Sequence, residues 1–155
     1  MKTYYKLFVC ILLFNCSDIE SQEVLITKFV EDIILQENLD YENWKKYIDF
    51  PKKQSYEGKK VINELITNQI KLINSKIKKN NNDYEIIPYK DLEKYNLSSK
   101  IIYKDLKSVY FLLSNKAIIT PIIIKKGEII AFFNGITKHK RNSYPWILNE
   151  SNIIN

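Results

Sequence analysis

The feature of this sequence that most constrains its fold is a change of hydrophobic period near the middle of the chain. Between residues 23 and 79, apolar side chains recur every three or four positions, which is the spacing of amphipathic helices. Between residues 108 and 133 they form short, almost continuous runs separated by turn signals, which is the pattern of buried strands. Helices followed by a block of strands are typical of an α+β fold. We therefore predict a single domain in which N-terminal helices pack on a small antiparallel sheet of about three to four strands.

Three helices are expected in the first half. Residues 23–37 form an amphipathic segment with apolar residues on one face at Leu25, Ile26, Phe29, Val30, Ile33 and Ile34. Asp40 is a predicted N-cap for a second, short helix that runs through Trp44 and Tyr47. Residues 57–79 make a long third helix, with lysines near its C-terminus that complement the helix dipole.

The second half is expected to contain strands and one helical turn. The predicted strands are Tyr84–Pro88, Ser108–Leu113, Ala117–Ile124 and Ile129–Phe133, and the helical turn is Asp91–Tyr95. Gly127, which takes a positive φ easily, marks a hairpin turn between the last two strands. The apolar run Ile122–Ile124 indicates a sheet that is covered on both faces. Pro121 predicts an edge or a bulge at its own position.

The first sixteen residues have the organisation of an export signal. Met1–Lys6 contains two lysines and no acid, and Leu7–Phe14 is an unbroken apolar run that is too short to span a bilayer. An ordinary cleavage site would need small residues after this run, but Asn15 and Cys16 stand there instead. One interpretation is a buried N-terminal strand in which Cys16 is incidental.

The other interpretation is a resemblance. Leu13-Phe14-Asn15-Cys16 resembles the cleavage box of bacterial lipoprotein signals, in particular those of Bacteroidetes, although Asn15 stands where that family prefers a small residue. The resemblance implies that residues 1–15 are a cleaved signal peptide and that Cys16 bears the lipid. Several acyl chains give stable membrane attachment. Residues 16–22 would then be an acidic tether, 23–150 the domain and 151–155 a C-terminal tail. The location implied is the cell envelope, either periplasmic or exposed on the outer membrane.

The charge balance narrows the choice of partners. The chain has 24 basic and 18 acidic residues, a net charge of +6 and a pI of about 9.1. Nucleic acid is nevertheless a disfavoured partner, because 23 of the bases are lysine and Arg141 is the single arginine. The charges are also unevenly placed, since residues 17–50 have a net charge of −6 and residues 51–155 one of +10. The acidic half is expected to pack on the basic half, to face a separate partner, or simply to be solvated.

The sequence offers no arrangement of residues that is typical of an enzyme. His139, the single histidine, stands among cations in Lys138–Arg141, which is expected to be an exposed basic loop, and has no neighbouring carboxylate to orient it. Three glycines are too few for the common phosphate-binding loops, and a lipidated Cys16 leaves no thiol for a metal. We therefore predict no catalytic residue, no metal and no cofactor. A small pocket enzyme that uses a buried carboxylate remains the alternative. The acids available for it are Glu31 with Asp32, Asp91 with Glu93, and Glu57 with Glu64.

Aromatic residues near the ends of elements are the candidate ligand or interface residues. They are Trp44, Tyr47, Tyr144 and Trp146. The order of helices and strands also resembles the pocket-forming fold of the nuclear-transport-factor-2-like superfamily. The resulting hypothesis is a lipid-anchored, non-catalytic module of the cell envelope that binds a small ligand or an envelope protein. A second alternative is an envelope immunity or inhibitor protein.

Overall fold

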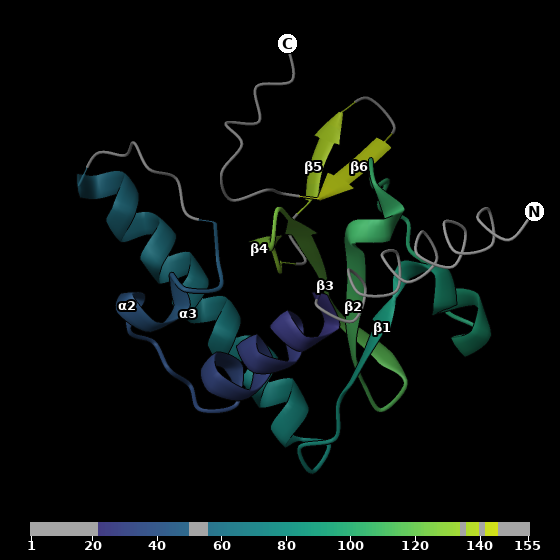
Figure 1. Ribbon diagram of the computed structural model, residues 1–155, viewed down its shortest axis with the longest axis horizontal. Helices are drawn as coiled ribbons and strands as arrows, with labels where there is room; N and C mark the ends of the chain where they lie inside the picture. The colour runs from purple at the N-terminus through teal and green to yellow at the C-terminus, as the bar shows by residue number, and fades with distance from the viewer. Residues whose placement is uncertain (1–21, 50–55, 134–135, 140–141, 146–155) are drawn as a thin grey trace, which may run out of the picture.

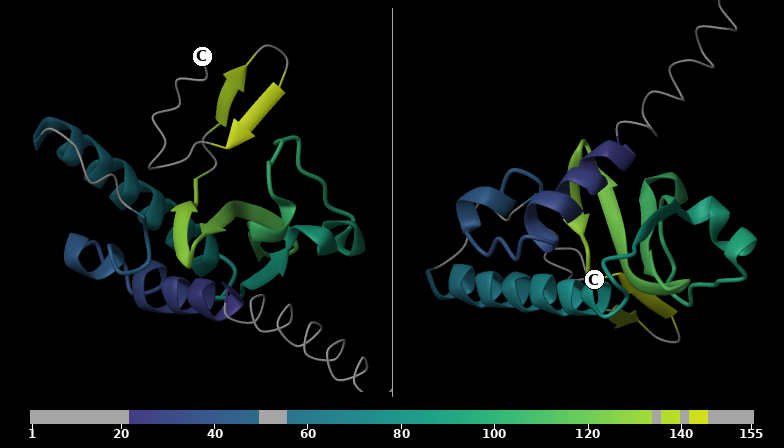
Figure 2. Two further views of the ribbon diagram at one scale, coloured as in Figure 1. Left: turned by 45° about the horizontal axis from the view of Figure 1, so that its top comes forward. Right: turned by 90° about the horizontal axis from the view of Figure 1, so that it is seen from below.

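The structure is a computed structural model that describes residues 22–49, 56–133, 136–139 and 142–145, the side chains of residues 136–139 and 142 excepted. It confirms the predicted α+β fold, because helices come first and pack on an antiparallel sheet (Figure 1). Seen from below (Figure 2), the helical segments within residues 22–44 and the long helix of residues 56–78 lie on one side of the sheet. A short helical segment near residue 90 lies on the other side (Figure 2).

The helices are close to the predicted ones. Residues 22–29 are α-helical and continue into the π-helical turn η1 (Val30–Ile34), and we call this continuous segment the first helix. The short helix α2 (Tyr41–Trp44) begins after Asp40, whose carboxylate accepts a hydrogen bond from the Glu42 N–H at 3.0 Å, as expected of an N-cap. It is shorter than predicted and ends in turns through Tyr47. The long helix α3 spans Tyr56–Lys78.

The main sheet has four antiparallel strands in the order β1-β2-β3-β4. Their bounds are β1 Glu85–Pro88, β2 Val109–Ser114, β3 Ala117–Lys125 and β4 Glu128–Ala131. The 3₁₀ helices η2 (Tyr89–Tyr95) and η3 (Leu106–Ser108) stand between β1 and β2 in the chain. Both hairpin turns have two residues with positive φ, Asn115 with Lys116 and Lys126 with Gly127, which matches the natural twist of paired strands.

A second sheet was not predicted. β5 (Ile136–His139) pairs with β6 (Asn142–Pro145) in a separate hairpin. The prediction of an exposed basic loop at Lys138–Arg141 is wrong for Lys138 and His139, which belong to β5. Strand β5 was missed because Ile136 is its single strongly apolar residue, so the segment lacks the alternation of apolar and polar residues that predicts a strand.

Pro121 lies in an interior strand, yet its surroundings explain why it is tolerated. β4 pairs with β3 only over Ile123–Lys125, so at Pro121 strand β3 is paired with β2 alone. The register with β2 also shifts next to Thr120, whose hydroxyl donates a 2.8 Å hydrogen bond to the carbonyl of Phe132. The bulge therefore lies at Ile119, two residues before Pro121, and Pro121 itself is a local edge position within a strand that is interior farther along.

Both faces of the sheet are covered, as predicted. Along β2, Tyr110 and Leu112 face a large core that also contains buried residues of the first helix, α2 and α3. Phe111 and Leu113 face a second, smaller core with residues of η2 and the segment that follows it. Every residue of β2 is buried, which explains its continuous apolar run.

One buried amide fastens the two long helical segments together. Asn74 of α3 is almost fully buried, and its Nδ2 donates hydrogen bonds to the carbonyls of Ile34 at 2.7 Å and Leu35 at 3.1 Å. These carbonyls lie at the C-terminal end of the first helix, where the supply of helical N–H donors runs out. The Ile34 carbonyl also accepts a 3.2 Å hydrogen bond from the Glu37 N–H. Asn74 therefore acts as a C-terminal cap supplied by a different helix.

Candidate functional site

The structure assigns the predicted aromatic site residues to different places. The Trp44 side chain is 1% exposed and belongs to the large core, where it packs edge-on against Tyr41 with 4.9 Å between ring centroids. Tyr144 is half-buried in β6, where the neighbouring Ser143 carbonyl accepts a 2.8 Å hydrogen bond from the Ile102 N–H. Trp146 and the predicted lipidation site Cys16 lie outside the described residues. The predicted aromatic residues thus do not converge on one site in the described part of the chain.

Tyr47 borders a polar hollow between the first helix and α2. Its hydroxyl donates a hydrogen bond to the Asp32 carboxylate, and this bond, with burial, raises the pKa of Tyr47 to about 12. The hollow has a volume of about 490 Å³ and is also lined by Glu31 and Lys46. Two of its amides are already engaged with each other, since the Asn43 Nδ2 donates to the Asn38 Oδ1 at 3.1 Å. The hollow is therefore open and polar, and part of its polar lining is occupied by internal hydrogen bonds.

A second hollow lies on the other face of the sheet, and we call it the η2–η3 cleft. It has a volume of about 440 Å³ and is formed by η2, residues 97–99, η3 and the start of β2. Its apolar lining consists of Pro88, Tyr89, Leu92, Leu97, Leu106 and Tyr110. Its polar lining consists of Lys90, Glu93, Ser98, Ser99 and Lys107. A mainly apolar hollow with a few polar groups is the usual form of a small-ligand site.

Local sequence signals explain why this cleft forms. η2 ends at Asn96, which has a left-handed φ of 54°, and the chain then turns back so that the Leu97 N–H donates to the Leu92 carbonyl at 3.0 Å. η3 begins at Asp105, whose side chain accepts a 3.0 Å hydrogen bond from the Lys107 N–H. Because both helical segments are short, they cover part of the sheet face and leave the space between them open.

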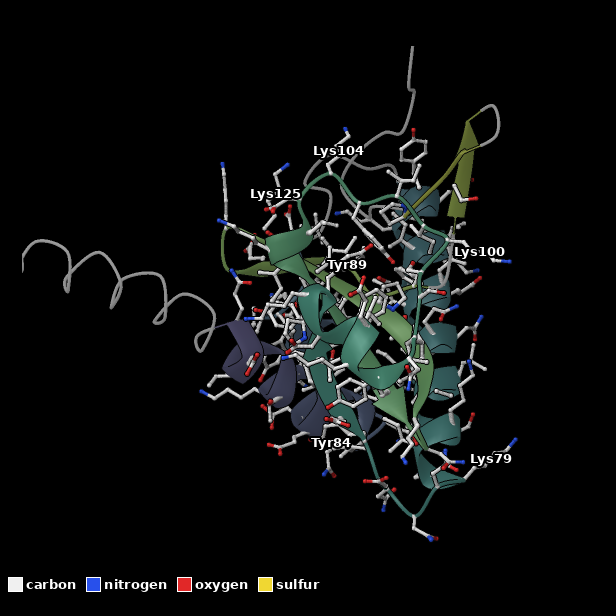
Figure 3. The ribbon with its side chains drawn as sticks, turned by 90° about the vertical axis from the view of Figure 1, so that its right-hand side faces the viewer. Lys79, Tyr84, Tyr89, Lys100, Lys104 and Lys125 are labelled. Carbon is white, nitrogen blue, oxygen red and sulfur yellow. The ribbon has the colours of Figure 1, made fainter. Side chains whose placement is uncertain are left out.

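An aromatic cluster forms the base of this layer. The Tyr89 ring lies 5.8 Å from that of Tyr103 and 6.0 Å from that of Phe111, and Tyr103 meets Phe111 edge-on at 6.0 Å. Burial raises the pKa of Tyr103, which keeps its phenol neutral. Figure 3 shows Tyr89 near the centre of this face. The mutual packing of the three rings holds one wall of the cleft in place.

The mouth of the cleft is positively charged. Lys90 and Lys107 are exposed, and neither forms an ion pair with a described residue. Glu93 is the one acid among the described lining residues. Asp105, beside Lys107, accepts hydrogen bonds from the Ser108 hydroxyl at 2.5 Å and from the Lys107 N–H, and these lower its pKa. The Asp105 carboxylate is thus engaged in the cap, and the charge of Lys107 also contributes to its lowered pKa.

The carboxylate that the pocket-enzyme hypothesis requires does not occur in the described part of the chain. None of its Asp or Glu residues is buried. A hydrogen bond from Lys78 lowers the pKa of Glu37, which is the opposite of the shift expected for a general acid in an apolar cavity. The same residues contain no group of three or more potential metal ligands. None of the helices that they form combines the length and the apolar character needed to cross a membrane.

Few ion pairs join the acidic N-terminal part to the basic C-terminal part of the described chain. Residues 22–49 contain seven acids and three lysines. Among the described residues, one ion pair connects this segment to the basic half, between Lys78 Nζ and Glu37 Oε1 at 2.8 Å. The pairs Lys45–Glu42 and Lys94–Asp91 are local. Apolar packing therefore holds the two halves together, and most of the acids remain on the surface of the first helix and α2.

No protein-family model, curated protein or solved structure matches this chain. The resemblances to bacterial lipoprotein signals and to the nuclear-transport-factor-2-like superfamily stay predictions. The η2–η3 cleft is the feature that sequence reasoning missed. Its one signal is the stretch 89–107, in which apolar and aromatic residues alternate with polar caps and no helical or strand period is kept.

Proposed function

We propose that this protein is a lipid-anchored, non-catalytic binding module of the cell envelope, and that its ligand site is the η2–η3 cleft. The observation that supports the proposal is the form of this cleft. Its walls are apolar, and its lining includes two serine hydroxyls and two lysines that form no ion pair with a described residue. The helical face of the sheet, by contrast, is filled by tightly buried side chains. The anchor is supported by the signal-like sequence that ends at Cys16.

The anchor is tested by intact mass and by membrane partitioning of the native protein, beside a Cys16→Ala variant. We expect a mass that matches cleavage before Cys16 plus acyl chains, and release of the variant into the soluble fraction. An uncleaved, unmodified protein that is soluble without the substitution would contradict the anchor. It would leave the cleft to be judged by a separate experiment.

The cleft is tested with Nile red, a neutral apolar fluorophore, added to the soluble Cys16→Ala protein. Leu106 at the cleft is 47% exposed and Leu72 on α3 is 44% exposed, so either can be changed to Asp with little effect on the core. We expect Leu106→Asp to lower the bound fluorescence and Leu72→Asp to leave it unchanged. The opposite result would place the apolar binding surface on α3 and would refute the cleft as the site.

A second candidate function, an envelope inhibitor or immunity protein, is favoured by the segregation of charge. The acids Glu31, Asp32, Asp40 and Glu42 are exposed on the first helix and α2 or directly beside them. A partner for this surface would be basic. This candidate predicts that a single basic protein co-purifies with the native chain and is released by salt, and that charge reversal at Glu31 and Asp32 prevents the association. Release that is insensitive to salt would count against it.

A further inference from the structure

We infer that the η2–η3 cleft binds an anionic amphiphile, with the negative head group held between Lys90 and Lys107 and the apolar body lying along the walls. This inference rests on the proposed function and adds the chemical class of the ligand. The class includes both fatty acids and phospholipids with an anionic head group.

The head group is indicated by the charges around the cleft. Lys90 and Lys107 both line it, and their ammonium groups form no ion pair with a described residue. Of the acids on η2 and at the start of η3, Glu93 is exposed, Asp91 is paired with Lys94, and Asp105 is held in the cap of η3. The register that places Val109 opposite Ile123 also brings the end of β3 toward η3. Lys125 ends β3 outside the cleft lining and lies opposite Glu128 of β4. In Figure 3, Lys104 and Lys125 lie toward the same end of this face.

The apolar body is indicated by the walls. Leu92 is buried, Leu97 is half-buried and Leu106 is largely exposed, so the apolar surface runs from the base of the cleft to its rim. A ligand without an apolar portion would leave this surface in water, at a cost of about 25 cal/mol for each Å². A ligand without a charge would leave both lysines without a partner. An anionic amphiphile would cover the apolar walls and also pair with the lysines.

The predicted anchor makes such a ligand available. Residues 17–21 separate Cys16 from the first helix and span at most about 20 Å when fully extended. A lipid on Cys16 would therefore hold the domain close to the membrane surface, where amphiphiles are concentrated.

The test uses the native, anchored protein in phosphatidylcholine nanodiscs at about pH 8. Two photoreactive probes with the same chain are compared, palmitic acid and hexadecanol, each with a diazirine in the chain. The attached label is mapped by peptide mass spectrometry. We expect the acid to label residues 88–107 about fivefold more than the alcohol does, which corresponds to two exposed charge contacts. A third probe, lyso-phosphatidylglycerol with the same chain, distinguishes the sources: strong labelling identifies a membrane phospholipid, and weak labelling identifies a free fatty acid.

A matched pair of double variants separates the specific effect from a change of net charge. Lys90→Gln with Lys107→Gln is expected to lower labelling by the acid about fivefold and to leave labelling by the alcohol unchanged. Lys71→Gln with Lys79→Gln removes the same charge from exposed positions, one within α3 and one just after its end, and should leave both unchanged. Equal labelling of the native protein by acid and alcohol would overturn the anionic ligand while leaving the cleft as a binding site. No label from any probe in residues 88–107 would overturn both.

Discussion

The two faces of the four-stranded sheet are covered by different kinds of element, and only one of them is sealed. The helical face is covered by the first helix, α2 and the C-terminal half of α3, whose buried residues run from Ile66 to Ile77. The other face is covered by η2 with seven residues, η3 with three, and the segment between them. A helix with a regular apolar stripe packs closely over the length of that stripe, whereas short 3₁₀ segments leave gaps between their ends. We conclude that the helical face supplies most of the stability and that the other face supplies the binding site.

The largest expected effect concerns Trp44, a candidate ligand residue in the sequence that the structure places in the sealed core. Trp44→Ala should lower the free energy of unfolding by about 3–5 kcal/mol, since it removes a large buried side chain and leaves a cavity. The measurement is urea unfolding followed by circular dichroism. Leu106→Ala at the cleft, the control, should change this free energy by less than about 0.5 kcal/mol. A Trp44 variant as stable as the native chain would mean that the indole is not part of the core.

A sharper comparison uses two neighbouring leucines on opposite faces of β2. Leu112 packs in the helical core and Leu113 in the smaller core, and both are almost fully buried. Truncation to alanine should cost about 2–5 kcal/mol at Leu112 and about 1 kcal/mol less at Leu113, because the short segments over Leu113 can move into the space that is left. Urea midpoints of the two variants give the difference directly. Equal costs would show that the second face is packed as rigidly as the first.

Asn74 provides a polar test of the sealed face. Asn74→Ala should cost about 1–3 kcal/mol, because the carbonyls of Ile34 and Leu35 lose the buried amide donor, while the Ile34 carbonyl keeps its 3.2 Å hydrogen bond from the Glu37 N–H. Hydrogen exchange at the C-terminal end of the first helix should also become faster. Asn68→Ala, at an exposed position of the same helix, is the control and should leave both quantities almost unchanged.

The helical face was largely predictable from the sequence, because its buried residues recur at the regular spacing of a helix. Ile66, Ile70, Ile73 and Ile77 repeat at helical spacing and all four are buried. Asp40 and Gly127 predicted a helix N-cap and a hairpin turn equally well, because each of these features depends on a few neighbouring residues. Trp44 shows the limit of such signals, since its position near a helix end gave no indication of whether its indole points into the core.

The cleft could not be predicted, because it depends on where nonperiodic segments pack. Nothing in the sequence near Lys90 and Lys107 shows that these residues border one hollow, since they stand on different 3₁₀ helices separated by a return of the chain. Asn74 was missed for the same reason, as its two acceptors are about forty positions earlier in the chain. Contacts of this kind are set by tertiary packing, which a pattern along the chain does not record.

The smallest expected effect is a pH dependence confined to the helical side. The hydrogen bond to Asp32 raises the pKa of Tyr47 from 10.0 to about 12, so the folded protein holds this proton more tightly than the unfolded chain does. The stabilisation is therefore complete below about pH 10 and is lost as the pH rises toward 12. Unfolding free energies of the native chain and of Tyr47→Phe should consequently converge over this range. The difference in tyrosinate absorbance between them should titrate near the raised pKa, and Asp32→Asn should move that titration back toward 10.0. A difference titration at the ordinary tyrosine value in the native chain would show that the pair does not form in solution.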